Sequence, residues 1–201
     1  MSCNEKLPVA AVITAAGLSS RMGKLKALLP FGKGSMLSAC VGNMRFAGAE
    51  DIVVVTGHRA EEISAESVKL GCRTVHNPDY AKNQMFDSLC MALRTLDMER
   101  GRVLISPVDA PAVKKSTLAK LMASEGEFVR PVFDGKPGHP VVLDAKRISE
   151  ILAYGGEGGL RGAIEALGIS VSDVETDDEG VCMDADTPED YEKILTLAER
   201  I

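Results

Sequence analysis

Short apolar runs alternate along the chain with longer stretches whose apolar residues recur every three or four positions. The runs are rich in β-branched residues and predict strands at Val9–Thr14, Ile52–Thr56, Arg73–His76, Val103–Ser106, Phe128–Phe133, Pro140–Leu143 and, from a weaker pattern, near Ile169–Val174. The periodic stretches predict helices at Met36–Phe46, Ala60–Lys69, Phe86–Leu96, Ser116–Ala123, Ala145–Ala153, Leu160–Leu167 and Pro188–Glu199. Apolar strands that alternate with helices favour a parallel sheet covered on both faces. We therefore expect a three-layer, Rossmann-like α/β domain with a mainly parallel sheet.

The stretch Val12–Gly32 contains a candidate binding loop directly after the first predicted strand. Its flexible, hydroxyl-bearing and basic residues are Gly17, Ser19, Ser20, Arg21, Gly23, Lys24 and Lys26. Backbone amides, hydroxyls and cations together favour a phosphate group, and ligands of such sheets bind at the carboxyl ends of strands. The loop differs from GxxxxGK[ST], because five residues separate Gly17 from Gly23 and Leu25 follows Lys24. It also lacks the GxGxxG pattern.

Charged residues are sorted along the sequence. The chain has 23 Lys and Arg against 29 Asp and Glu, a net charge of −6, yet residues 6–49 contain no acid and residues 162–192 no base. Such sorting indicates a site or a partner, or else two solvated surfaces of opposite charge. The acidic balance and the 4% aromatic content argue against a nucleic-acid partner, which would favour a basic face with stacking rings.

Length and cysteine usage favour a single cytoplasmic domain. A chain of 201 residues with 45% hydrophobic content can bury an ample core, and we expect one domain over residues 1–201. The five cysteines form no CxxC pair, as is typical of a reducing compartment rather than a disulfide framework or a zinc site. No apolar run has the length of a signal peptide or a membrane span, so we expect no membrane partner.

Two acidic segments carry candidate metal ligands. Asp109 follows the strand Val103–Ser106 between two prolines, where it could hold a cation or merely turn the chain. Farther on, Thr187 and the proline after it predict the start of a helix. They do not account for Asp184 and Asp186, which we expect at the end of another strand. Carboxylates from two strand ends would suit a hard cation such as Mg²⁺.

Several segments together resemble the molybdenum cofactor nucleotidyltransferases. They are TAAGLSSRMGKLKALLPFG from Thr14, the carboxylate in PVDAP, GHPVVL from Gly138, DADTPEDY from Asp184 and, less specifically, GEGGLR from Gly156. The matches cover nearly the whole chain and follow the family's order. The resemblance implies a fold of the nucleotide-diphospho-sugar transferase type. It also implies transfer of a nucleoside monophosphate from an NTP to a phosphorylated acceptor, with release of pyrophosphate.

The same resemblance assigns nucleotide contacts to matching residues. Ala15, Ala16 and Gly17 would face the nucleoside, and Ser88 would also contact the nucleotide. Ser19 and the loop amides would surround the phosphates. Arg21 would hold the leaving β- and γ-phosphates, and Lys26 would neutralise charge on the α-phosphate. These roles suit phosphoryl-type transfer, which depends on positioning and electrostatic stabilisation.

Metal and acceptor contacts are implied in the same way. Asp109 and Asp186 would bind Mg²⁺, with Asp184 competing for the second position. His139 would lie near the acceptor, or else point to solvent or cap a loop. Arg161 would reach an acceptor phosphate, or else be a solvated cation at the start of a helix. An acceptor phosphate is already ionised at neutral pH, so no general base is required.

The identity of the nucleotide depends on one small residue. Relatives that transfer GMP carry LAGG where this chain has Thr14–Gly17, the pattern of the cytidylyl-transferring branch. The methyl group of Ala16 would narrow the base pocket against a purine, although one or two methyl groups discriminate by only about 1–3 kcal/mol. The chain departs from its relatives at Asn83 or Gln84 and at Val108, where they usually have Gly.

These observations predict a Mg²⁺-dependent cytidylyltransferase that acts on molybdopterin or its metal-loaded form, with a molybdoenzyme as a candidate client. One alternative keeps the chemistry but uses another NTP or a sugar or polyol phosphate. Another is a carrier or insertion chaperone for the cofactor, and a third is a nucleotide-binding regulator.

Overall fold

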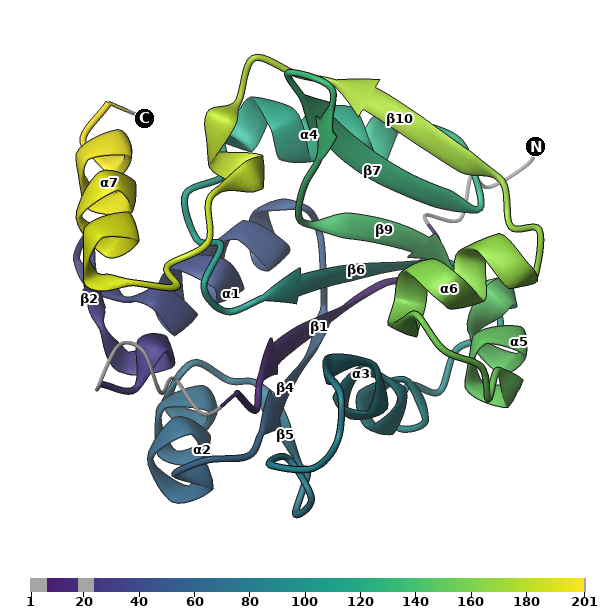
Figure 1. Ribbon diagram of the computed structural model, residues 1–201, viewed down its shortest axis with the longest axis horizontal. Coiled ribbons are helices and arrows are strands. Elements are labelled where there is room, and N and C mark those ends of the chain that lie inside the picture. The colour runs from purple at the N-terminus through teal and green to yellow at the C-terminus, as the bar shows by residue number, and fades with distance from the viewer. Residues whose placement is uncertain (1–6, 18–23, 201) are drawn as a thin grey trace, which may run out of the picture.

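The computed structural model describes residues 7–17 and 24–200, in which strands and helices alternate as predicted (Figure 1). The strands are β1 (Val9–Ala15), β2 (Pro30–Phe31), β3 (Gly34–Ser35), β4 (Asp51–Thr56), β5 (Arg73–His76), β6 (Arg102–Pro107), β7 (Phe128–Phe133), β8 (Lys136–Pro137), β9 (Val141–Asp144) and β10 (Val171–Glu175). The α-helices are α1 (Met36–Phe46), α2 (Ala60–Lys69), α3 (Met85–Leu93), α4 (Lys115–Ala123), α5 (Ile148–Ala153), α6 (Gly159–Ala166) and α7 (Pro188–Ala198). The 3₁₀ turns are η1 (Lys26–Leu28), η2 (Ala145–Arg147) and η3 (Glu179–Cys182).

The main sheet has the strand order β10-β7-β9-β6-β1-β4-β5, with β8 beside β7. Strands β6, β1, β4 and β5 are parallel to one another, and β10 is parallel to β7. Strand β9 is antiparallel to both β6 and β7. The carboxyl ends of β1, β4, β5 and β6 therefore lie at one edge of the sheet, where α/β folds bind their ligands.

Helices cover both faces of the sheet. Alternate residues of β1 point to opposite sides: Ala11 and Ile13 pack with apolar residues of α1, α2 and α4, whereas Val12 packs with those of α3, α5 and α6. Figure 1 shows these helices on either side of the strands. The expected three-layer, mainly parallel α/β fold is confirmed.

Helix α7 packs against a segment from the first quarter of the sequence. Ile194 and Leu197 of α7 pack against Leu29 and Met36, beside η1. The helix begins as predicted: the Thr187 hydroxyl accepts a hydrogen bond from the Asp190 backbone N–H, and a proline occupies the first turn. This packing places the acidic segment that precedes α7 near η1.

Short elements account for most differences from the predicted pattern. Turn η1, the hairpin β2–β3, strand β8 and turn η3 are each too short to produce a periodic pattern. The predicted helix Ala145–Ala153 begins as η2 before it becomes α5, and the last predicted strand starts at Val171. Among the helices of residues 7–17 and 24–200, none combines the length and apolar character needed to cross a membrane.

Candidate active site

A lysine and two carboxylates meet at the carboxyl edge of the sheet. The Lys26 Nζ atom lies 2.9 Å from Asp109 Oδ2 and 2.6 Å from Asp186 Oδ1. The lysine comes from η1, Asp109 from the loop after β6, and Asp186 from the segment before α7. Residues distant in the sequence thus form one charged cluster.

Solvent access differs between the members of this cluster. The side chains of Lys26 and Asp109 are 13% and 20% exposed, whereas that of Asp186 is 54% exposed. Burial alone would lower the pKa of Lys26, but its hydrogen bonds to Asp186 and Asp109 and their negative charges outweigh burial and raise it. Lys26 therefore keeps its charge at neutral pH and holds the two carboxylates close together.

The acidic segment does not end a strand, contrary to the expectation for Asp184 and Asp186. Both residues lie in irregular structure between η3 and α7. The backbone N–H of Ala185, between them, donates to the carbonyl of Asp109 at 3.1 Å. This single bond fixes the segment against the end of β6, and the cap at Thr187 starts a helix before any strand ladder can form.

Asp184 is the most perturbed carboxyl of the segment. Part of the residue is exposed, yet desolvation of the carboxyl, followed by the charges of Asp109 and Asp186, raises its pKa to about 6. It is Asp186, and not Asp184, whose carboxylate is hydrogen-bonded to Lys26. Asp109 and Asp186 therefore form the carboxylate pair, and Asp184 is a third acid whose pKa responds to their charges.

The carboxylate pair offers hard oxygen donors of the kind that Mg²⁺ prefers. Across residues 7–17 and 24–200, no three His, Cys, Asp or Glu side chains are grouped closely enough to hold a metal ion. Magnesium commonly binds one or two carboxylates and completes its shell with water and substrate phosphates. Asp109 and Asp186 fit that mode, provided that Lys26 moves from between them toward another anion.

A cavity of about 170 Å³ opens beside the cluster at the end of β1. Its lining includes Thr14, Ala15, Ala16, Gly17, Leu25, Lys26, Ala27, Tyr80, Asn83, Gln84, Met85, Ser88, Pro107, Val108 and Asp109. The predicted contacts Ala15, Ala16, Gly17 and Ser88 thus lie in one pocket with Lys26 and Asp109. The predicted contacts Ser19 and Arg21 lie outside the described residues.

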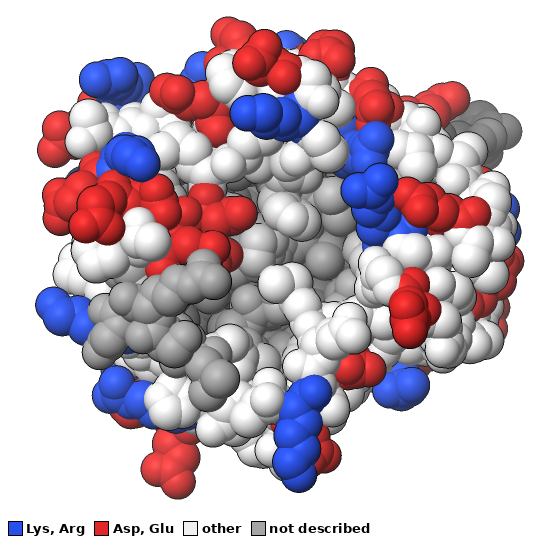
Figure 2. Space-filling view, viewed as in Figure 1, with Lys and Arg blue, Asp and Glu red and all other residues white. Residues whose placement is uncertain are grey.

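The pocket has two chemically distinct ends. Lys26 and Asp109 make one end charged, whereas Tyr80, Met85 and Ser88, from the loop before α3 and from α3 itself, form the other. Sequence reasoning missed Tyr80, because a lone aromatic residue in a loop carries no pattern. In Figure 2 a hollow in the middle of this face has acidic side chains along one side.

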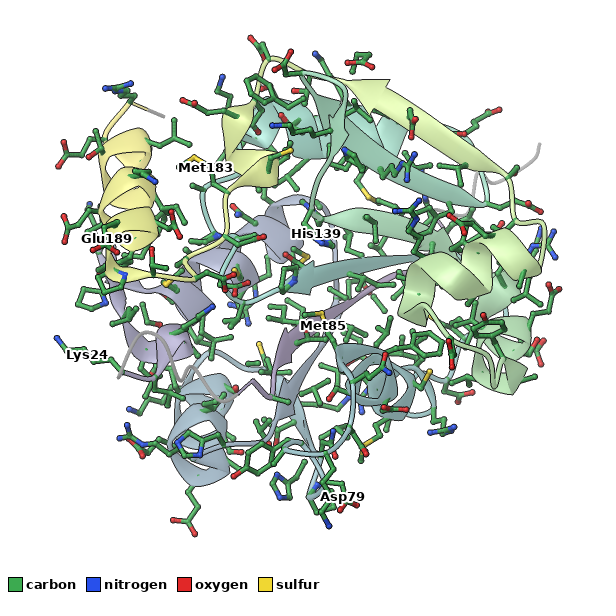
Figure 3. All side chains as sticks on the ribbon, in the orientation of Figure 1. Lys24, Asp79, Met85, His139, Met183 and Glu189 are labelled. Carbon is green, nitrogen blue, oxygen red and sulfur yellow. The ribbon has the colours of Figure 1, made fainter. Side chains whose placement is uncertain are left out.

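His139 lies on the same face, at the turn before β9, where Figure 3 labels it above Met85. Its backbone N–H donates to the carbonyl of Val181, and its Nδ1 atom is buried with no hydrogen-bond partner among the described residues. Burial lowers the pKa of His139, and the charge of Asp109 partly opposes this. A neutral imidazole near Asp109 is compatible with the predicted acceptor contact, which stays a prediction.

Arg161 has a different setting. Its side chain is 84% exposed and pairs with Glu165, one turn farther along α6, at 2.8 Å. It does not line the cavity beside Lys26. This is the arrangement of a solvated helix cation, the alternative that the sequence had left open, and its contact with an acceptor phosphate stays a prediction.

Comparisons with known proteins show which family the chain belongs to. The model of the MobA-like NTP transferase domain matches residues 11–171. The molybdenum cofactor cytidylyltransferase of Escherichia coli K12 is 30% identical over 192 residues, covering 94% of this chain and 95% of the relative. The nicotine blue oxidoreductase of Paenarthrobacter nicotinovorans is 26% identical over 198 residues, covering 93% and 96%.

Among solved structures, a nucleotidyl transferase from Methanothermobacter thermautotroptrophicus has the same fold. It superposes with a TM-score of 0.82 at 24% identity, over 96% of this chain and 98% of the other. The family model and the Escherichia coli relative both span most of the sequence. The chain therefore belongs to the MobA-like NTP transferase domain family, the nucleotidyltransferases that its motifs resemble.

Proposed function

We propose that this protein transfers CMP from CTP to molybdopterin or its metal-loaded form and releases pyrophosphate. The observation that carries the proposal is the placement of Lys26 between Asp109 and Asp186, at the charged end of the pocket that Thr14–Gly17 begins. A cation poised beside two carboxylates, next to a small pocket, suits a triphosphate whose α-phosphate is attacked.

The different chemistry of the two ends of the pocket favours one orientation of the bound nucleotide. The triphosphate lies toward Lys26 and Asp109, and the base lies toward Ser88 and Tyr80. An oxygen of the acceptor phosphate attacks the α-phosphorus, and the bond to the β-phosphate oxygen breaks, so that pyrophosphate leaves. Lys26 stays protonated and offsets the negative charge that gathers on the α-phosphate oxygens.

Asp109 and Asp186 would hold Mg²⁺, and Asp184 stands beside them. When bound, the ion supplies charge stabilisation for the phosphate oxygens. Lys26 then exchanges its carboxylate partners for the α-phosphate. Arg21 would hold the leaving phosphates, as the sequence resemblance implies.

The acceptor would enter beside His139. The residue is partly exposed, and its buried Nδ1 atom has no partner among the described residues, so a polar ligand that entered here would supply the imidazole with a hydrogen-bond partner. A phosphorylated pterin offers both an ionised phosphate and ring heteroatoms that accept or donate hydrogen bonds.

The preference for CTP is supported by the buried methyl group of Ala16 and by the name of the Escherichia coli relative. A cytoplasmic location and a molybdoenzyme client are part of the same proposal. The alternative with the same chemistry uses another NTP as the donor, or a sugar or polyol phosphate as the acceptor. A carrier, an insertion chaperone or a regulator would bind the ligand without turnover.

The direct test is pyrophosphate release by the purified protein with MgCTP and molybdopterin. We expect release with CTP and molybdopterin, and much less with GTP or with a sugar phosphate. Release with a sugar phosphate but not with molybdopterin would contradict the acceptor. Nucleotide binding without turnover would favour the carrier or regulator.

Asp109→Asn tests the metal assignment. Because Asp109 would hold the ion that stabilises the phosphates, we expect pyrophosphate release to fall by about 100-fold or more. Asp51→Asn is the matched control, since Asp51 begins β4 at the opposite end of the strands and pairs with Arg73. Turnover that survives in Asp109→Asn, or that is lost equally in Asp51→Asn, would refute the assignment.

A further inference from the structure

A buried asparagine links the end of β5 to the wall of the pocket. Asn77 directly follows β5, is 1% exposed, and donates its backbone N–H to the carbonyl of Thr56 at 2.8 Å. Its side-chain Nδ2 atom donates to Ser88 Oγ at 2.9 Å. Ser88 lies in the first turns of α3, is 4% exposed and lines the cavity.

The orientation of the Asn77 amide is fixed by its other partner. The backbone N–H of Asp79 points to Asn77 Oδ1 at 3.0 Å, and a backbone N–H can only donate. The oxygen of the amide must therefore face Asp79, and the NH₂ group must face Ser88. Ser88 Oγ is accordingly the acceptor in this pair.

This arrangement leaves the proton of the Ser88 hydroxyl for a ligand. A hydroxyl has one proton to donate, and the bond from Asn77 occupies a lone pair rather than that proton. Across residues 7–17 and 24–200, no acceptor receives the Ser88 proton. The hydroxyl of an ordinary pocket serine can rotate and either donate a hydrogen bond to a ligand or accept one. The bond from Asn77 uses one of the acceptor positions of Ser88 and so favours donation.

We propose that Asn77 is a positioning residue that makes Ser88 a dedicated hydrogen-bond donor toward the base. The inference rests on the proposed function, which places the base at this end of the pocket. A donor here favours a base edge with an acceptor, such as the C2 carbonyl or ring N3 of cytosine. It disfavours the edge of guanine that presents N–H groups, so it adds a polar criterion to the steric one of Ala16.

The test is a double-mutant cycle on MgCTP affinity, measured by calorimetry on the full chain. We expect Ser88→Ala to weaken binding by about 3- to 10-fold, the range of one neutral hydrogen bond. Asn77→Ala should also weaken binding, and the double variant should be no weaker than Ser88→Ala alone. That non-additivity identifies action through Ser88. If Asn77→Ala binds like wild type, or if its effect is unchanged in the Ser88→Ala background, the proposal is wrong.

Asn77→Asp keeps the volume of the side chain and reverses its role. An aspartate at this position accepts from both Asp79 N–H and the Ser88 hydroxyl, so it consumes the proton that the base needs. We expect it to weaken CTP binding as much as Ser88→Ala does, and wild-type affinity would overturn the proposal. Thermal denaturation of each variant sets a titration temperature at which all of them are folded.

Ser67→Ala is the matched control, because Ser67 is a fully buried serine that donates to Ile63 within α2. Its CTP affinity should equal that of wild type, and an equal loss there would contradict a specific role for Ser88. If wild type binds no CTP, the proposed function itself fails. If wild type binds CTP and the cycle is additive, only the role of Asn77 fails.

Discussion

Lys26 sets the electrostatic state of the site before any ligand binds. Its ammonium group neutralises part of the charge on Asp109 and Asp186, which would otherwise repel each other. If Asp109 and Asp186 hold Mg²⁺ as proposed, Lys26 and the ion would compete for the same oxygens. The lysine would then shield the carboxylates from free metal until a phosphate draws it away.

Lys26→Met should separate two proposed roles of Lys26, which are to shield the carboxylates from metal and to stabilise the α-phosphate. Two unit charges 4 Å apart interact by about 4 kcal/mol at an effective dielectric constant of about 20. Removing the lysine charge should therefore tighten binding of free Mn²⁺ by about 10-fold or more, while pyrophosphate release falls by about 100-fold or more. Electron paramagnetic resonance titration measures free Mn²⁺, with the exposed Lys33→Met as control. Unchanged Mn²⁺ affinity in Lys26→Met would argue against competition.

Asp184 predicts a pH dependence of stability. Its pKa is raised to about 6, above the value near 4 expected in an unfolded chain. Between these values the folded state binds more protons, so stability falls as pH rises from about 4 to about 6. Asp184→Asn removes this loss. In metal-free buffer, the melting temperature of Asp184→Asn relative to wild type should rise across that window and then level off. Parallel curves for the two proteins would contradict the assignment.

At the level of elements, the turn after β4 packs closely against Ala16, which follows β1, because Gly57 in that turn has no side chain. A Cβ atom on Gly57 would lie 2.5 Å from the carbonyl oxygen of Ala16 and 2.6 Å from Tyr80 Cβ. Glycine therefore lets Ala16 and Tyr80, which line the cavity beside Lys26, approach the turn that follows β4.

Gly57→Ala should displace that wall. We expect a loss of about 1–3 kcal/mol in unfolding free energy, as for overpacked cores, together with weaker MgCTP binding. Gly42→Ala in α1 is the matched control, since nothing lies within 4 Å of its Cβ position, and it should stabilise the helix by up to about 1 kcal/mol. Urea unfolding and calorimetric titration measure both quantities. Unchanged CTP affinity in Gly57→Ala would show that the wall adjusts.

Hydrogen bonds to one buried carboxylate hold turn η3 in position. Asp178 is fully buried and accepts hydrogen bonds from Lys114 N, Thr117 Oγ1 and Gly180 N. These bonds tie the start of α4 to the turn that leads to Asp186. The sequence could not single out Asp178, because it is one of many acids in a segment that reads as a solvated face.

At the scale of the molecule, two segments of opposite charge that are far apart in the sequence lie in contact. The acid-free and base-free segments meet where Lys26 bonds Asp186 and where α7 packs against Leu29 and Met36. The alternation of apolar and polar residues was enough to predict the three layers and most boundaries of helices and strands, because its period shows which face of each element is buried. It did not predict the antiparallel β9 or the irregular acidic segment, because both depend on contacts between distant residues.

Ile194→Ala tests whether α7 holds the site together. Ile194 is fully buried, and its truncation should cost about 2–5 kcal/mol of stability. Because α7 anchors the segment that contains Asp186, MgCTP binding should weaken as well. Ile151→Ala, equally buried in α5, should cost similar stability without that effect on binding. Equal losses of affinity in both variants would mean that stability alone explains them.

The bond between Lys26 and Asp186 spans 160 positions of sequence. A ribosome releases the amino-terminal half of a chain first, and that half can begin to fold before the rest has been made. In a nascent chain, Lys26 would therefore be synthesised long before Asp186 is available to pair with it. A chain that stops before Asp186 would therefore lack this ion pair and the charged cluster that it completes.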